Sequence, residues 1–206
     1  MPRRRSLTTA QIAAAALAVL DRDGPAGLSM RAVAAETGVS TMALYRYVAD
    51  REELEGLMVD AVFGAVDAAP PPGPWRERVA VLAERVRAAV AAHPAIIPLT
   101  VAHRHRSPAM LRWSEAVLAV LTEAGQTGAA RVVALRALTA YVIGAVQLEH
   151  LGPLAGPGTD ALAALPADAF PLLAATARAA AAVSVEREFH RGLALLLDGL
   201  DGPSAQ

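Results

Sequence analysis

Apolar residues recur at intervals of three and four through most of the chain, which is the spacing expected of amphipathic helices. Hydrophobic residues make up 54% of the 206 residues but aromatic residues only 4%, so alanine, valine and leucine dominate. This composition favours the packing of helices over the packing of sheets. The chain is long enough for one or two domains with a sizeable core. We therefore predict an all-α protein.

The most informative local pattern is LSMRAVAAETGVSTMALYRYVADR, residues 28–51, which divides into two short helices around one glycine. Ser29 and Ser40 stand where the two helices begin, and a serine oxygen can cap a helix N-terminus. Gly38 stands where the first helix must stop, and glycine adopts a positive φ at little cost. The pattern predicts a helix-turn-helix, a motif whose second helix usually enters the major groove of DNA.

An ordinary helical hairpin is the alternative interpretation of the same stretch. Two features favour DNA binding instead. The second helix carries aromatic and methionine side chains that a solvated face does not usually select, and it lies between Arg31 and Arg51, which are placed to meet phosphates. Packing against the preceding helix is the alternative for Tyr47. The candidate DNA contacts are Arg31, Thr41, Met42, Tyr45, Arg46, Tyr47 and Arg51.

The distribution of charge supports a nucleic-acid partner, although the formal net charge of −1 does not. Residues 1–51 hold seven arginines and four acidic residues, a net of +3, and residues 52–206 hold twelve arginines and sixteen acidic residues, a net of −4. The basic end coincides with the helix-turn-helix, as expected of a surface that contacts phosphate. Arg3, Arg4 and Arg5 form either a basic arm that touches phosphate or minor groove, or a tail that only aids solubility.

The first twenty residues resemble a secretory signal peptide, because a basic start precedes nine apolar residues, and residues 4–7 are similar to a twin-arginine signal. Thr8 and Gln11, however, form a capping box, and the segment 21–24 ends a helix where cleavage would have to occur. We therefore predict the first helix of a DNA-binding head. The chain has no cysteine, which is compatible with a reducing cytoplasm, where we place the protein.

A cluster of prolines separates two parts of the chain. Asp50 and Glu53 form a capping box that begins a helix from Arg51 to about Val66. The sequence DAAPPPGP, residues 67–74, then ends it, because prolines end helices and stiffen a link. We predict a helix-turn-helix domain in residues 1–66, a linker in residues 67–74 and a helical body in residues 75–206.

Helices are expected throughout the body, over 75–92, 108–124, 129–151, about 172–182 and 185–200. The segment 152–166 is rich in glycine and proline and predicts a loop or a partly ordered linker. The helix over 129–151 has twelve uncharged residues in a row, 137–148, whereas a membrane span needs roughly twenty. We therefore expect a buried helix of a soluble protein and no membrane partner.

The run GVSTMALYRYVADREEL, residues 38–54, closely resembles the recognition-helix signature of TetR-type transcriptional regulators, G-V-x-x-x-x-L-Y-x-[HY]-[VF] followed by a polar turn and a charged helix start. The resemblance extends back over residues 7–66, and the late segment EFHRGLALLLDGL is also family-like. It implies a three-helix DNA-binding head, a larger C-terminal body for ligand binding and dimerisation, and a repressor released from a palindromic operator in double-stranded DNA by a small molecule. It also implies that Thr41, Met42 and Tyr45 face the groove while Arg31 and Arg51 anchor the backbone.

The helices over 129–151 and 185–200 are too apolar to be covered by a body of this size alone. A second copy of the chain is the simplest cover, and TetR-type proteins generally pair their last helices in a four-helix bundle. Two-fold symmetry also suits a palindrome, whose half-sites lie about one helical turn apart. We predict a homodimer whose interface includes Val132, Leu138, Val142, Phe189, Leu193 and Leu196.

The resemblance further implies a small-molecule pocket among the middle helices. Ordinary core packing is the alternative for the larger apolar candidates. The pair His103 and His105 is a candidate for a metal site, but residues two apart on a helix point to different sides, so we predict neither metal nor cofactor. The candidate pocket residues are His103, Met110, Trp113, Tyr141, Gln147, Glu149 and His150.

No arrangement typical of an enzyme is found, since the sequence has no cysteine, glycine-rich phosphate loop, HExxH or GxSxG. We therefore predict that the protein is not an enzyme. Two alternatives to the ligand-released repressor stay open: a regulator with no small-molecule effector, and a helical ligand-binding or scaffold protein without DNA affinity.

Overall fold

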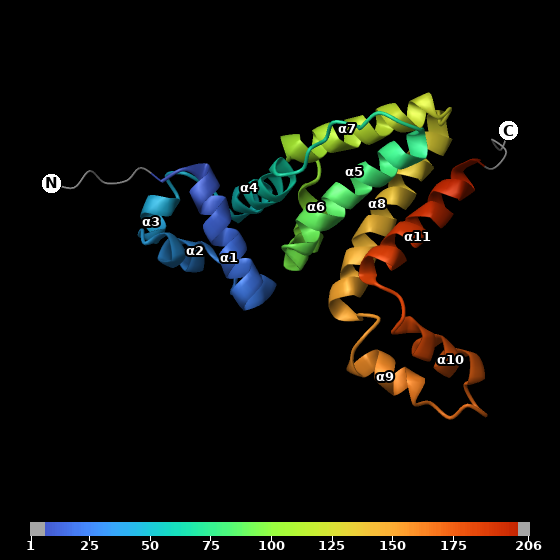
Figure 1. Cartoon of the computed structure of the whole chain (residues 1–206). Coiled ribbons are helices and arrows are strands. Elements are labelled where there is room, and N and C mark those ends of the chain that lie inside the picture. The colour runs from blue at the N-terminus through green and yellow to red at the C-terminus, as the bar shows by residue number, and fades with distance from the viewer. Residues whose placement is uncertain (1–6, 202–206) are drawn as a thin grey trace. The chain divides into compact units, whose positions relative to one another are not determined.

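The computed structural model describes residues 7–201, and these form eleven α-helices and two short 3-10 helices without a strand (Figure 1). The predicted all-α class, with a helix-turn-helix head followed by a helical body, is confirmed. The contacts between residues that are close in space divide the chain into two compact units. One unit holds the residues up to Ala69 together with Ala88–Ala116, and the other holds Pro70–Arg87 together with the residues from Val117 onward.

The first unit is built on α1, which packs against α2 and α4, while α2 packs against α3. The unit contains α1–α4. After residues 70–87, which belong to the second unit, the chain returns with the last residues of α5, with η1 and α6, and with the first residues of α7. The bounds are α1 Thr9–Gly27, α2 Met30–Thr37, α3 Thr41–Leu44, α4 Arg51–Gly64, α5 Trp75–Ala91, η1 Pro94–Ile96, α6 Ile97–His103 and α7 Pro108–Glu123.

Helix α1 begins as predicted and ends later than predicted. The Thr8 hydroxyl accepts a hydrogen bond from the Gln11 amide at 3.2 Å, and the Gln11 side chain accepts one from the Thr8 amide at 3.0 Å, so the capping box is confirmed. Gly24, with φ of 69°, breaks the helix where the sequence predicts its end. Pro25 then begins a further turn that runs to Gly27, because its fixed φ suits the first turn of a helix.

The second unit is organised around α8 (Gly128–Leu151) and α11 (Val185–Asp198), which pack side by side (Figure 1). Along the chain, α8 and α11 are separated by α9 (Pro157–Ala163) and α10 (Pro171–Ala180), which pack against each other. The short helix η2 (Gly199–Asp201) follows α11. The prediction of a loop or a partly ordered linker over 152–166 is therefore wrong for residues 157–163, which form α9, whereas residues 152–156 and 164–166 lie outside any helix. Pro157 occupies the first turn of α9, a position where proline lacks no needed hydrogen bond, so a proline-rich segment here begins a helix.

Helix α8 is long and apolar enough to cross a membrane by length and composition alone, with a mean hydropathy of 1.6 over its most apolar window. The same test is passed by core helices of soluble proteins. Within the second unit one stripe of α8 is buried, formed by Ala134, Leu138, Val142 and Val146 at steps of four residues. The opposite side of the helix stays exposed.

Candidate nucleic-acid interface

The turn between α2 and α3 is fixed by local hydrogen bonds at each of its corners. The Ser29 hydroxyl accepts from the Ala32 amide at 3.2 Å and caps α2. Gly38 ends α2 with φ of 71° and ψ of 23°, the left-handed conformation that glycine adopts without strain. The Ser40 hydroxyl then accepts from the Ala43 amide at 3.2 Å and caps α3. The predicted caps and the predicted glycine turn are all confirmed.

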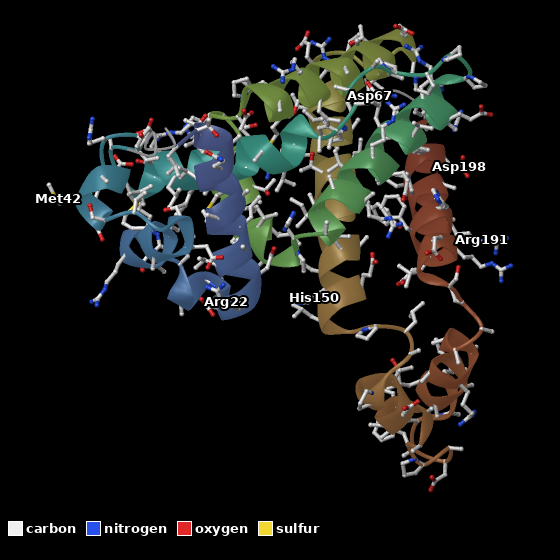
Figure 2. The ribbon with its side chains drawn as sticks, turned by 60° about the vertical axis from the view of Figure 1, so that its left-hand side comes forward. Arg22, Met42, Asp67, His150, Arg191 and Asp198 are labelled. Atoms are coloured by element: carbon white, nitrogen blue, oxygen red, sulfur yellow. The ribbon has the colours of Figure 1, made fainter. Side chains whose placement is uncertain are left out.

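Helix α3 is shorter than expected, because its α-helical part ends at Leu44 and a turn continues to Val48. Leu44 and Val48 are both buried and attach this segment to the head. The opposite side presents Met42, which is 76% exposed, together with the exposed rings of Tyr45 and Tyr47. Figure 2 shows the Met42 side chain projecting away from the surrounding helices. A segment this rigidly capped, with large side chains left in solvent, has the form of a recognition element.

The arginines of the head differ in how far they are neutralised. Arg22 is paired with Asp23 at 3.0 Å and with Glu36 at 2.9 Å, and both carboxylates raise the pKa of its guanidinium. Arg31 and Arg46 are exposed and have no ion-pair partner in the described part of the chain. Arg51 donates from Nε to Glu55 at 2.7 Å. The positive charge at Arg31 and Arg46 is thus available to an anionic partner, whereas the charge of Arg22 is not.

The predicted basic arm of Arg3, Arg4 and Arg5 lies outside the described residues.

Asp50 caps α4 by accepting from the Glu53 amide at 2.8 Å, as predicted. The return bond of the capping box differs, because Glu53 accepts from the amide of Ala49 at 2.6 Å. Both bonds fix the chain between α3 and Arg51.

Two family models match the chain. The family described as bacterial regulatory proteins of the tetR family matches residues 7–54, and the tetracyclin repressor-like C-terminal domain matches residues 68–202. The second match alone covers more than half of the chain.

The chain belongs to the TetR family.

Individual TetR-family relatives agree with this assignment. The transcriptional repressor DrrR1 of Streptomyces coeruleorubidus is 34% identical over 144 residues, which are 69% of this chain and 53% of that protein. A transcriptional regulator of Saccharopolyspora erythraea is 35% identical over 146 residues, which are 70% of this chain and 62% of that protein. The chain thus spans between half and two thirds of the length of these curated relatives.

Among solved structures, the TetR-family protein ActR of Streptomyces coelicolor, in complex with actinorhodin, superposes with a TM-score of 0.79 at 27% identity. The match covers 98% of this chain and 100% of ActR. The fold of the whole described chain is therefore that of a TetR-family regulator.

The second unit of this TetR-family chain contains a hollow of about 210 Å³ between α8 and α11. Glu149, which lines this hollow, is paired with Arg87, whose Nη1 donates to it at 2.9 Å. The pKa of Arg87 is raised, mainly by its hydrogen bond to Glu84 and to a smaller extent by Glu149. Burial, with a smaller contribution from Glu188, raises the pKa of Tyr141. The hollow offers a largely apolar surface with few polar groups, lined by Tyr141, Leu148, Glu149, Val185, Glu188 and Phe189.

The structure distributes the seven predicted pocket residues over both units. His103, Met110 and Trp113 belong to the first unit and are buried there. Of the four in the second unit, Tyr141 and Glu149 line the hollow, whereas Gln147 and His150 are exposed and do not line it. His103 is buried, and its Nε2 lies 2.9 Å from a carboxylate oxygen of Glu55.

The predicted interface residues also divide into two groups. Leu138, Val142, Phe189 and Leu193 are buried within a single chain, in the unit where α8 and α11 pack against each other. Buried side chains offer a partner little surface, so an interface on these helices must use other residues. Val132 is exposed and Leu196 half-buried, and the neighbouring Val133, Leu148 and Leu195 are exposed as well.

Sequence reasoning missed the polar contacts between α4 and the segment that ends α6. Glu55 binds His103, and the Asp60 carboxylate accepts from the Ser107 hydroxyl at 2.7 Å and from the Ala109 amide at 3.0 Å. The one signal in the sequence is the spacing of four between Arg51 and Glu55, which permits an ion pair along a helix. Nothing local indicates the partners near residue 103.

Proposed function

We propose that this TetR-family chain is a DNA-binding transcriptional regulator, a repressor that binds a palindromic operator as a homodimer and leaves it when a small molecule binds. We place it in the cytoplasm, where it meets DNA. The observation that carries the proposal is the exposed face of α3, where Met42 and Tyr45 stand in solvent on a backbone capped at both sides of its turn. A scaffold helix of four residues gains nothing from such a face.

Recognition divides into two roles in this proposal. Thr41, Met42 and Tyr45 contact base edges, with the methionine and the tyrosine ring suited to thymine methyl groups. Arg31, Arg46 and Arg51 contact phosphates, and the hydroxyl of Tyr47 is a further phosphate donor.

Dimerisation is proposed through the exposed sides of α8 and α11. Leu195 on α11 is 76% exposed, and Leu148 and Val133 on α8 are 60% and 64% exposed. Helices that keep large apolar residues in solvent are expected to bury them against a partner. A second copy supplies this cover with two-fold symmetry, and the same symmetry presents two α3 segments to a palindrome.

Ligand control is proposed for the second unit. The hollow beside Tyr141 and Glu149 has the apolar lining and sparse polar groups of a small-molecule site. One similar structure supports this role, since ActR is solved with actinorhodin, and DrrR1, which is named a repressor, supports the repressor role. Coupling of ligand to DNA affinity in such systems amounts to roughly 1–3 kcal/mol, enough to lower occupancy several-fold or more.

Selection of bound duplexes from a random DNA pool tests the proposal. The parent chain is compared with an Arg31→Ala, Tyr45→Ala double variant, which removes one phosphate contact and one base contact. We expect the parent to enrich a palindrome and the double variant not to. If the parent enriches no sequence even at low salt, where phosphate contacts are strongest, the chain is not a sequence-specific regulator. That outcome would favour the alternative of a ligand-binding protein without DNA affinity, whose function resides in the second unit.

A further inference from the structure

Arg51 is the exposed end of a line of three hydrogen-bonded side chains. Its Nε donates to Oε1 of Glu55 at 2.7 Å, and Oε2 of the same carboxylate lies 2.9 Å from Nε2 of His103. A carboxylate accepts hydrogen bonds, so Nε2 carries the hydrogen of the second contact. The side chains of Glu55 and His103 are 13% and 7% exposed. The surface guanidinium is thus attached to a buried imidazole through one carboxylate.

The stability of α4 does not explain an arginine at this place. Arg51 is the first residue of α4, and a positive charge is unfavourable at a helix N-terminus. An arginine four residues before a glutamate is also the weaker of the two orders for an ion pair along a helix. Glu52 and Glu53 follow the favourable pattern at the same helix end. A residue that departs from the local preference while its neighbours follow it is expected to serve a function.

Glu55 and His103 depend on each other. A carboxylate that is mostly buried is costly unless it is paired, and Glu55 has two partners. Nδ1 of His103 is buried and has no hydrogen-bond partner in the described part of the chain, so Glu55 supplies the only polar contact of this ring there. Loss of either side chain leaves a buried polar group of the other without its partner.

The segment that carries His103 is held against α4 at two further points. Nη2 of Arg106 lies 2.8 Å from Glu52, and Asp60 accepts from Ser107 and from the Ala109 amide. His103 is the last residue of α6, so these contacts fix its position from the adjoining turn. The place of the Glu55 carboxylate is therefore set by the end of α6 as well as by α4.

We propose that Glu55 and His103 are positioning residues of the DNA interface, which hold Arg51 by Nε so that Nη1 and Nη2 bind one phosphate. This inference rests on the proposed function, because it assumes that Arg51 meets DNA. Both Nη atoms have no partner in the described part of the chain, and the two can form parallel bonds to a phosphate. A long side chain that is already ordered loses less entropy on binding, which corresponds to about two- to tenfold in affinity.

The first test is a double-mutant cycle between Arg51 and Glu55, measured by fluorescence anisotropy on one labelled duplex at low salt. Glu55→Gln removes a negative charge near DNA, which by itself tightens binding. It also replaces the ion pair with Arg51 by a weaker hydrogen bond to a neutral amide oxygen, so Arg51 is held less firmly. We expect this loss to dominate, with binding about two- to tenfold weaker. In an Arg51→Ala background only the charge effect is left, so Glu55→Gln is expected to tighten binding slightly. This reversal of sign is the specific signature of positioning.

The second test asks whether His103 acts through Glu55. In His103→Gln the amide nitrogen can still donate to the carboxylate, so DNA affinity is expected to stay within about twofold of the parent. In His103→Leu the donor is lost, and we expect the same weakening as for Glu55→Gln, present with Arg51 and absent in the Arg51→Ala background. Thermal unfolding of each variant shows whether a change in affinity reflects lost fold instead.

The matched control is Glu36→Gln, which releases Arg22 from an ion pair of 2.9 Å elsewhere in the head. We expect it to change affinity equally with and without Arg51. Weakening by Glu55→Gln that is the same in both backgrounds overturns the positioning role, and so does an Arg51→Ala variant that binds as tightly as the parent. In both cases the proposed function stands, because the parent still binds DNA. A parent that binds no duplex at any salt concentration removes the proposed function and this inference together.

Discussion

Gly192 on α11 leaves open the space that the hydroxyl of Tyr141 on α8 occupies. A Cβ at position 192 would overlap that hydroxyl and would lie 3.0 Å from two ring carbons of the tyrosine. The hydroxyl donates to the carbonyl of Phe189 at 2.7 Å, and the ring centroids of Tyr141 and Phe189 are 5.5 Å apart. One missing side chain thus permits the close packing of the two helices around which the second unit is built.

Replacement of this glycine is expected to destabilise the second unit. Gly192→Ala should cost about 1–3 kcal/mol, the usual cost of overpacking a core. In a Tyr141→Phe background the nearest atom is gone while the two ring carbons stay close, so the cost should be smaller but not zero. Urea unfolding of the four proteins measures the difference. Equal costs in both backgrounds would show that the tyrosine hydroxyl is not what the alanine meets.

The same tyrosine predicts a loss of stability at alkaline pH. Burial and the charge of Glu188 raise the pKa of Tyr141 in the folded state, so the unfolded chain releases this proton at a lower pH. The contribution to stability is fully present below a pH of about 10, the unperturbed pKa, and is lost as the pH rises through the folded pKa. Between pH 8 and pH 11 the parent should therefore lose more free energy of unfolding than Tyr141→Phe. Parallel curves for the two proteins would contradict this assignment.

Two glycines of the head should respond in opposite directions to alanine. Gly38→Ala forces a left-handed backbone on a residue with a Cβ, and we expect a loss of about 1–2 kcal/mol. Gly56 lies inside α4 with nothing within 4 Å of the place that an alanine methyl would take, so Gly56→Ala should stabilise by about 0.5–1 kcal/mol. Thermal unfolding compares the two variants. No loss at Gly38 would contradict the cost of the left-handed turn, and a loss at Gly56 would contradict the open space there.

The proposed dimer depends on the exposed leucine at position 195. Leu195→Glu replaces the exposed large apolar side chain of α11 by a charge, and we expect it to yield a monomer at micromolar concentration. Leu111→Glu, on the exposed side of α7 in the first unit, is the control and should leave the assembly unchanged. Sedimentation equilibrium distinguishes the two. A parent chain that is itself monomeric at this concentration would remove the dimer from the proposal.

The parts of the fold that the sequence predicts well are those fixed within a few residues. The caps by Thr8, Ser29 and Ser40 join groups three residues apart, and the turn at Gly38 depends on one residue type. Such contacts can be derived from spacing alone. Helix α9 could not be predicted, because a proline in the first turn of a helix has the same sequence signature as a proline in a loop.

Contacts between distant segments could not be derived in this way. Glu55 and His103 are 48 residues apart, and only the packing of α6 on α4 brings them together. Periodicity likewise shows that a stripe is buried but not what buries it. For this reason Leu138 and Phe189, expected at a dimer interface, lie in the core of a single chain, while the exposed Leu195 falls outside the predicted interface.

The ratio of two dissociation constants tests the central claim most directly. One is measured on the palindrome that selection enriches and the other on a scrambled duplex of the same composition, at the same salt concentration. For the parent we expect the palindrome to bind at least about 10³-fold more tightly, as specific DNA-binding proteins do. In a Thr41→Ala, Met42→Ala, Tyr45→Ala variant that keeps its thermal stability, the ratio should fall toward one. A ratio near one for the parent itself would contradict the account, because the face of α3 would then read no sequence.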